Sequence, residues 1–109
     1  MVLSKSQRAI RKFREGEKLL ASAEAVNELA RETTSAIKKC RRRLGFWQEP
    51  RHHATVPEQV YAQQQRQAEL WEIERLRLVR KRLWNQGARY KKKAEFAILQ
   101  GLKLRSETE

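Results

Sequence analysis

The side chains with the clearest chemical potential in this 109-residue chain are its lysines and arginines, which gather in three blocks. Residues 1–18 carry six basic and two acidic side chains, residues 38–51 carry six and one, and residues 75–93 carry nine and none. Solvated helix faces usually alternate charges of opposite sign, so this segregation favours another role. Lysine binds phosphate as a point charge and arginine through a planar fork. We therefore expect the blocks to contact a polyanion and release its counterions.

Most of the basic side chains of these blocks are candidate nucleic-acid-binding residues. They are Arg8, Arg11, Lys12, Arg14, Lys38, Lys39, Arg41, Arg42, Arg43, Arg51, Arg75, Arg77, Arg80, Lys81, Arg82, Arg89, Lys91, Lys92 and Lys93. Phe46 and Trp47, next to the second block, are candidates for stacking on exposed bases, although contact with a protein neighbour explains them equally well. Trp71 and Trp84 fall on or near an apolar stripe, and we expect them to be core anchors.

The rest of the sequence offers no constellation with recognisable chemistry. Cys40 is the single cysteine, and His52 and His53 follow it without the two further ligands that a metal would need. The histidines also lack a nucleophile or a positioned carboxylate. No phosphate-binding glycine loop and no nucleophile–histidine–acid set occurs. We expect no enzyme activity, no metal, no cofactor and no small-molecule substrate.

The composition limits how the basic residues can be positioned. Hydrophobic residues make up 39% of the chain and charged residues 35%, which provides apolar stripes on helices but no layered interior. All 13 acidic residues are Glu, and the 4 Gly and 2 Pro are few for a sheet. The net charge of +12 makes a nucleic acid the default partner. The sequence predicts one all-α, elongated domain over residues 1–109, with little independent core.

A first helix is expected over about residues 5–44. Ser4 and Gln7 have the spacing of a capping box, and small or apolar residues follow at steps of mostly three and four. Gly45 stands where helices commonly end in the left-handed conformation, after a turn rich in cations. Gly16, inside the pattern, indicates a kink or a close helix contact.

Two further helical segments are expected after a connector over residues 45–55. Thr55 and Glu58 form a second capping box, so helix two should run over about residues 56–86 and break or bend near Gly87. A third, C-terminal helical segment should cover about residues 88–104 and fray near Gly101, before a loose tail. The short connector favours an antiparallel hairpin of the two long helices. That hairpin would set the first basic block beside residues 82–93 and leave the second block at the bend.

The compartment is constrained by the cysteine and by the N-terminus. A lone cysteine cannot form an intrachain disulfide, which favours a reducing, intracellular compartment. No run approaches the roughly 20 apolar residues that span a bilayer, so we expect no membrane partner. The first fourteen residues contain five basic residues, two serines and no acid, a composition like that of a transit peptide. We expect the mitochondrial matrix or, otherwise, the cytoplasm.

The leading hypothesis is a structural RNA-binding subunit of a large ribonucleoprotein, most simply a ribosomal or mitochondrial ribosomal protein that contacts rRNA and neighbouring proteins. The chain resembles small helical ribosomal proteins in composition and architecture. RNA is preferred to DNA because no compact helix-turn-helix, basic-zipper or zinc-finger pattern is present. The alternatives are a helical adaptor or assembly factor that packs on proteins, and a DNA-binding accessory protein. A membrane-surface helix pair ranks last because Glu residues share the helices.

Overall fold

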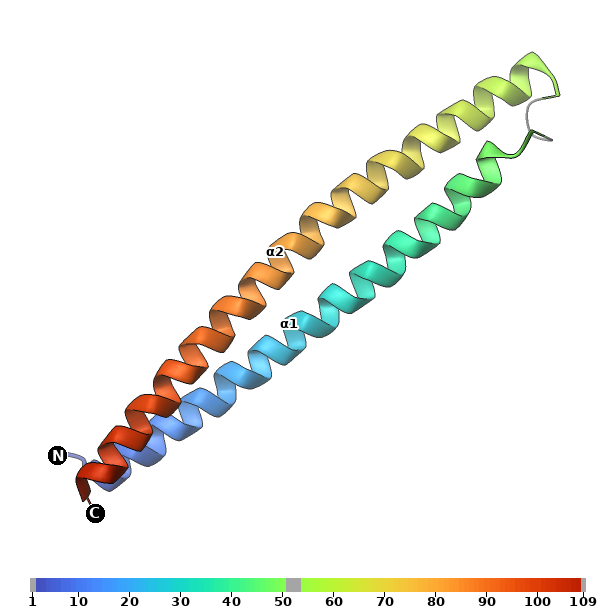
Figure 1. Cartoon of the computed structure of the whole chain (residues 1–109). Helices are drawn as coiled ribbons and strands as arrows, with labels where there is room; N and C mark the ends of the chain where they lie inside the picture. The colour runs from blue at the N-terminus through green and yellow to red at the C-terminus, as the bar shows by residue number, and fades with distance from the viewer. Residues whose placement is uncertain (1, 51–53, 109) are drawn as a thin grey trace. The chain divides into compact units, whose positions relative to one another are not determined.

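The computed structural model describes residues 2–50 and 54–108, which form two helices (Figure 1). Helix α1 spans Lys5–Gln48 and helix α2 spans Val56–Thr108. The described residues contain no strand, so the prediction of an all-α chain with two long helices is confirmed. The helices divide between two compact units: unit 1 is Met1–Glu28 with Leu83–Glu109, and unit 2 is Leu29–Arg82. In each unit a segment of α1 runs antiparallel to a segment of α2.

Both helices begin at the caps that the sequence predicts. The Ser4 backbone N–H donates to Gln7 Oε1 at 3.0 Å, and the Gln7 N–H donates to Ser4 Oγ at 3.2 Å, which completes the first capping box. At the second helix, the Glu58 N–H donates to Thr55 Oγ1 at 3.3 Å. These bonds satisfy N–H groups that have no partner inside a helix, so they define where α1 and α2 begin.

The end of α1 differs from the prediction, because the helix passes through Gly45 and ends at Gln48. No described glycine has a positive φ. The extra turn brings Trp47 edge-on against Tyr61, with ring centroids 5.3 Å apart, and Phe46 packs edge-on against Trp47 at 5.0 Å. Such aromatic contacts contribute about 0.5–1.5 kcal/mol each beyond the burial of area, which offsets the roughly 1 kcal/mol that a helical glycine costs.

The predicted break near Gly87 and the separate C-terminal segment are also wrong, because α2 is continuous to Thr108. Gly87 is buried, and a Cβ built on it would stand 2.5 Å from Asn27 Oδ1. Gly101 does not fray the helix either, since it is buried with the Phe13 ring 2.9 Å from its would-be Cβ. These glycines allow close approach of α1 and α2 rather than ending a helix.

In unit 1 the two helix segments meet through small residues, which we call the glycine–alanine seam. Its buried members recur at intervals of seven, the spacing of a coiled coil. They are Ala9, Gly16 and Ala23 on α1, and Gly87, Ala94 and Gly101 on α2, and the buried Ala97 lies three residues after Ala94. A Cβ on Gly16 would stand 2.7 Å from Ile98 Cγ1 and 3.3 Å from the Ala94 carbonyl oxygen. The predicted close contact at Gly16 is therefore confirmed, with backbone nearly touching backbone.

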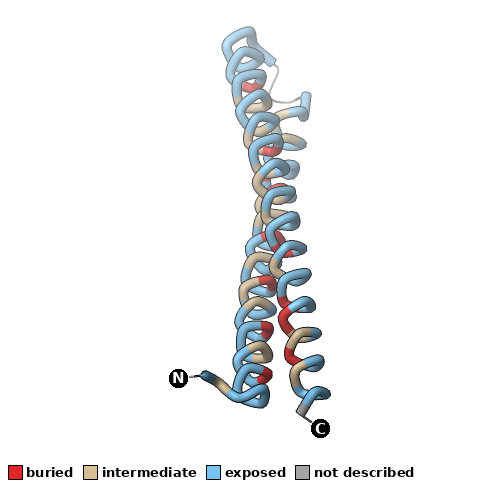
Figure 2. Tube along the Cα trace, turned by 90° about the vertical axis from the view of Figure 1, so that its left-hand side faces the viewer, coloured by how far each residue is buried: buried red, intermediate tan, exposed pale blue. Residues whose placement is uncertain are grey.

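In unit 2 the same seven-residue spacing continues with larger side chains. Ile37 and Cys40, both at most 2% exposed, pack with Ile73, and Leu44 and Leu76 border them. An ion pair between Arg43 Nε and Glu69 Oε1, 2.7 Å apart, joins the two helices beside this cluster. Figure 2 shows the buried residues of each unit on the faces where its two helix segments meet. A narrow seam is thus all the core that either unit has.

The two kinds of glycine predict opposite effects of substitution. Gly45→Ala should raise the free energy of unfolding by about 0.5–1 kcal/mol, because the site is helical and open space surrounds it. Gly16→Leu should lower it by about 1–3 kcal/mol, because the Ala94 carbonyl and Ile98 would have to move. Urea unfolding followed by circular dichroism measures both. Equal effects at the two positions would contradict the close packing at Gly16.

Candidate nucleic-acid interface

The seams leave the basic side chains pointing outward. Since each helix commits only its seam positions to the neighbouring helix, the remaining positions face solvent. Among the described members of the predicted set, Lys12 and Arg80 are half-buried and the others are exposed. An exposed Lys or Arg keeps its charge at neutral pH and can exchange water for a phosphate.

A minority of the predicted contact residues already hold a partner. Lys12 pairs with Glu15 at 3.3 Å, Arg43 with Glu69 at 2.7 Å, and Arg75 with Glu72 at 2.6 Å, while Arg80 donates to Thr34 Oγ1 at 3.3 Å. The Glu72 carboxylate raises the pKa of Arg75, and the Arg75 guanidinium lowers that of Glu72, through their hydrogen bonds. These pairs support the helices and their packing, and they leave less charge for a ligand.

The other predicted cations have no hydrogen-bond or ion-pair partner among residues 2–50 and 54–108. They are Arg8, Arg11, Arg14, Lys38, Lys39, Arg41, Arg42, Arg77, Lys81, Arg82, Arg89, Lys91, Lys92 and Lys93. Arg51 lies outside the described residues, as do His52 and His53. Since packing of the described fold does not use these charges, they are available to a partner.

Unit 1 holds twelve basic and seven acidic residues, a net charge of +5. The glycine–alanine seam sets the two basic segments of unit 1, residues 8–14 and 89–93, at different heights along the helix pair. Phe13 meets Gly101, so residues 8–14 lie beside the end of α2. The Gly16–Ala94 and Asn27–Gly87 contacts bracket residues 89–93, which therefore lie beside residues 17–26 of α1. The first block therefore adjoins residues 89–93 only at its C-terminal end, near Gly16 and Lys18, because the small seam residues set the register.

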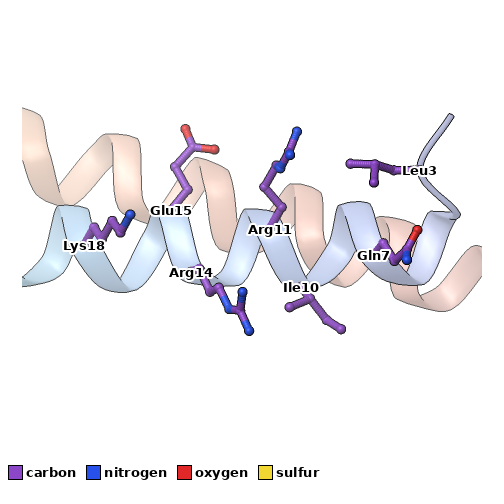
Figure 3. Close-up of a pocket in the computed structure, with 7 residues that line it drawn as sticks. All are labelled: Leu3, Gln7, Ile10, Arg11, Arg14, Glu15 and Lys18. Carbon is purple, nitrogen blue, oxygen red and sulfur yellow. The ribbon is translucent and has the colours of Figure 1, made fainter. Parts of the chain in front are cut away.

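An open depression of about 620 Å³ lies on the outer face of α1 in unit 1 (Figure 3). Its cations are Arg11, Arg14 and Lys18, and Leu3 and Ile10 give it an apolar part. In Figure 3 Arg14 and Ile10 project to one side of α1, and Arg11 to the opposite side. Lys18, which is not among the predicted contact residues, lies four residues after Arg14, a spacing that indicates a shared helix face.

Unit 2 holds thirteen basic and six acidic residues, a net charge of +7. The Arg80–Thr34 and Arg43–Glu69 contacts align residues 34–43 of α1 with residues 69–80 of α2. The second basic block is therefore not isolated at a bend, because the cations of residues 38–43 share this unit with those of residues 75–82. This alignment sets residues 38–43 beside residues 69–75, which include Glu69, Glu72 and Glu74, so the two basic blocks of unit 2 adjoin only in part.

The aromatic side chains are placed differently from the expectation. Trp71 is 72% exposed and Trp84 is 51% exposed, so the prediction that they are core anchors is wrong. Trp47, a candidate for stacking, is half-buried against Tyr61, whereas Phe46 is exposed. Phe96, which the sequence analysis did not single out, is 63% exposed. The signal that would have found it is the seven-residue repeat, because Trp71 and Phe96 both fall outside the seam positions.

Cys40 is buried in the seam of unit 2, where Arg43 Nη2 donates to its sulfur at 3.2 Å. Burial raises the pKa of the Cys40 thiol, the Glu69 carboxylate raises it further, and the Arg43 charge acts in the opposite direction. No group of three or more His, Cys, Asp or Glu in the described residues is placed to hold a metal ion. The thiol therefore packs as a small apolar group.

The buried thiol predicts slow alkylation of the folded protein. Iodoacetamide should modify Cys40 at least about tenfold more slowly in the folded chain than in the urea-unfolded chain. The pH at which the alkylation rate rises should also be higher for the folded chain than for the unfolded one. The stability that the neutral thiol contributes is complete below its ordinary pKa and is lost as pH rises through the raised, folded-state pKa. Equal rates with and without urea would show that unit 2 does not protect the thiol.

Comparison with protein-family models, curated proteins and solved structures finds no match to this chain. In the described part of the chain, neither helix contains a stretch long and apolar enough to cross a membrane. The arrangement can bind a polyanion, because both helices of both units carry exposed cations whose charged groups have no partner within the described residues.

Proposed function

We propose that this chain is a structural RNA-binding subunit of a ribonucleoprotein particle, most simply a ribosome. The observation that carries the proposal is the set of exposed cations that have no partner within the described residues. Phosphate backbones bind such side chains by releasing condensed counterions, and this requires no pocket. A particle subunit also has protein neighbours, which would cover exposed apolar side chains such as Leu99 and Leu102.

RNA is favoured over duplex DNA by the dimensions of a helix pair. Two packed helices, each about 10 Å across with axes about 8–10 Å apart, are about 20 Å wide, whereas the major groove of B-DNA is about 12 Å wide. A paired scaffold therefore suits contact with phosphates across a folded surface better than insertion into a groove. Folded RNA presents such surfaces, and single-stranded loops between them.

A helical adaptor is the second candidate, and the exposed apolar residues favour it. Trp71, Phe96 and Leu99 are all more than 60% exposed, and side chains of this kind are common anchors of protein interfaces. An adaptor would use its cations only for an acidic protein. The two functions differ in whether binding survives when nucleic acid is absent.

A mitochondrial location remains our proposal, with one structural condition. Ala9 belongs to the glycine–alanine seam of unit 1 and the Phe13 ring lies against Gly101, so residues 5–14 contribute to the fold. An import signal in this stretch would have to be read before folding and kept after import. The cytoplasm is the alternative location.

The proposal predicts RNA binding with a steep dependence on salt. The affinity for a structured RNA should fall about 10³- to 10⁵-fold between 50 and 200 mM salt if six to ten phosphates are contacted. Replacing Lys91, Lys92 and Lys93 by Gln should reduce the slope of log K against log[salt] by about 2. Filter binding over a salt series measures both quantities.

The matched control is Lys5→Gln with Lys12→Gln, because these lysines already pair with Glu107 and Glu15. We expect this variant to change the slope much less than the triple variant does. Absent or salt-insensitive binding of RNA would reject the proposal. Preference for duplex DNA in a competition at fixed salt would support the DNA-binding alternative instead.

A further inference from the structure

The outer face of α2 in unit 2 carries a straight row of aromatic, apolar and basic side chains. Trp71, Arg75, Leu78 and Arg82 follow one another at steps of four, three and four, so they lie along one face of the helix. Trp71 is 72% exposed and Leu78 is 51% exposed. We call this set the Trp71 row. It contains no acidic residue, although Glu72 holds Arg75 from one side.

A second row of the same kind lies on α2 in unit 1. It consists of Arg89, Lys92, Phe96, Leu99 and Lys103, at steps of three and four. Phe96 is 63% exposed and Leu99 is 64% exposed. The charged groups of its three cations have no hydrogen-bond or ion-pair partner among the described residues. We call this set the Phe96 row. Each row therefore presents one exposed ring and one exposed leucine on the same helix face as two or three cations.

These exposed rings are not explained by folding. Neither row contributes a buried residue, and water in contact with large apolar side chains is unfavourable. An aromatic ring between cations is the arrangement that holds single-stranded nucleic acid, because bases stack on the ring while phosphates bind the charges. Duplex RNA and DNA hide the faces of their bases, so only unpaired nucleotides can use the rings.

We propose that Trp71 and Phe96 are stacking platforms for unpaired nucleotides of RNA, with the cations of their rows on the flanking phosphates. The inference rests on the proposed function and adds to it the class of RNA, namely loops, bulges or single strands. Along a helix, Arg75 and Arg82 are separated by about 10 Å, and Trp71 lies about 6 Å before Arg75. A base on the ring therefore brings its own backbone near Arg75, where its phosphate would compete with Glu72 for the guanidinium.

Charge selects this occupant over a second copy of the chain. The two units carry net charges of +5 and +7, so burying the Trp71 rows or the Phe96 rows of two copies against each other would bring like charges together. An acidic helix of another protein is the competing occupant. Binding of such a helix would depend on the size of the side chain at positions 71 and 96, whereas stacking of a base requires the flat π-face of a ring.

The test compares an oligonucleotide that has bases with one that has none. Fluorescence anisotropy at fixed salt measures the affinity of the full chain for a labelled single-stranded RNA of about 12 nucleotides and for an abasic strand of the same length and charge. The ratio of the two affinities isolates the contribution of the bases. The variants are Trp71→Leu, Trp71→Phe, Phe96→Leu and Phe96→Tyr, and Val60→Leu is the control at an exposed apolar position outside both rows.

We expect the wild-type chain to prefer the strand with bases, and the Leu variants to lose about tenfold of that preference at each position. The Phe and Tyr variants should retain most of it, because they keep a ring, and the control should match the wild type. All variants alter exposed side chains, and circular dichroism verifies that their helix content is unchanged. Affinity for the abasic strand should be unaffected throughout.

The possible failures are distinguishable. If the wild-type chain binds neither strand, the proposed function fails and this inference fails with it. If the wild type binds both strands but the Leu variants keep the same ratio as the wild type, the cations bind RNA and the rings do not stack on bases. That result would overturn the inference alone and would favour the acidic helix as the occupant of the rows.

Discussion

The close approach of backbones along the glycine–alanine seam is the constraint on which the rest of unit 1 depends. At Gly16 a single added carbon would stand 2.7 Å from Ile98, so the register between α1 and α2 has little freedom there. The register decides which cations become neighbours, and it places residues 8–14 beside the end of α2. In unit 2 the register between α1 and α2 is set by the larger side chains around Ile37 and Cys40, with the Arg43–Glu69 pair beside them.

A seam this narrow has an electrostatic consequence. The apolar area that stabilises each unit is small, whereas each unit carries an excess of positive charge that opposes compaction. A polyanion that binds the folded form would offset this repulsion and stabilise the fold by mass action. Binding of a polyanion would therefore be coupled to folding, as is common in subunits that assemble on nucleic acid.

The parts of the fold that depend on local chemistry were predictable from the sequence. Ser4 and Thr55 cap helices through hydrogen bonds to residues three positions away, and a reader of the sequence can see both partners. The continuation of the helices through Gly45 and Gly87 was not predictable in this way, because glycine is common both at helix ends and at close helix contacts. At Gly87 the close contact with Asn27 on the partner helix decides the outcome, whereas Gly45 has open space around it and the Trp47–Tyr61 contact favours continuation of the helix.

The candidate interface shows the same division. That the lysines and arginines are exposed follows from their chemistry, and the blocks were visible in the sequence. Which blocks adjoin was not, because it depends on the register of the seam. The prediction that Trp71 is buried was wrong because Trp71 fits a pattern with steps of three and four, whereas it lies outside the strict repeat of seven that the seam follows. Reading the repeat from Ala9 to Leu44 separates the seam from the outer face.

The most direct test of the central claim, that the outward cations bind RNA within a particle, is sedimentation of the tagged chain from cell extract on a gradient, with and without RNase. The account predicts that the chain travels with a large particle and moves to the top of the gradient after RNase treatment. A chain that sediments slowly in both samples, or that stays bound to one protein partner after RNase, would contradict it.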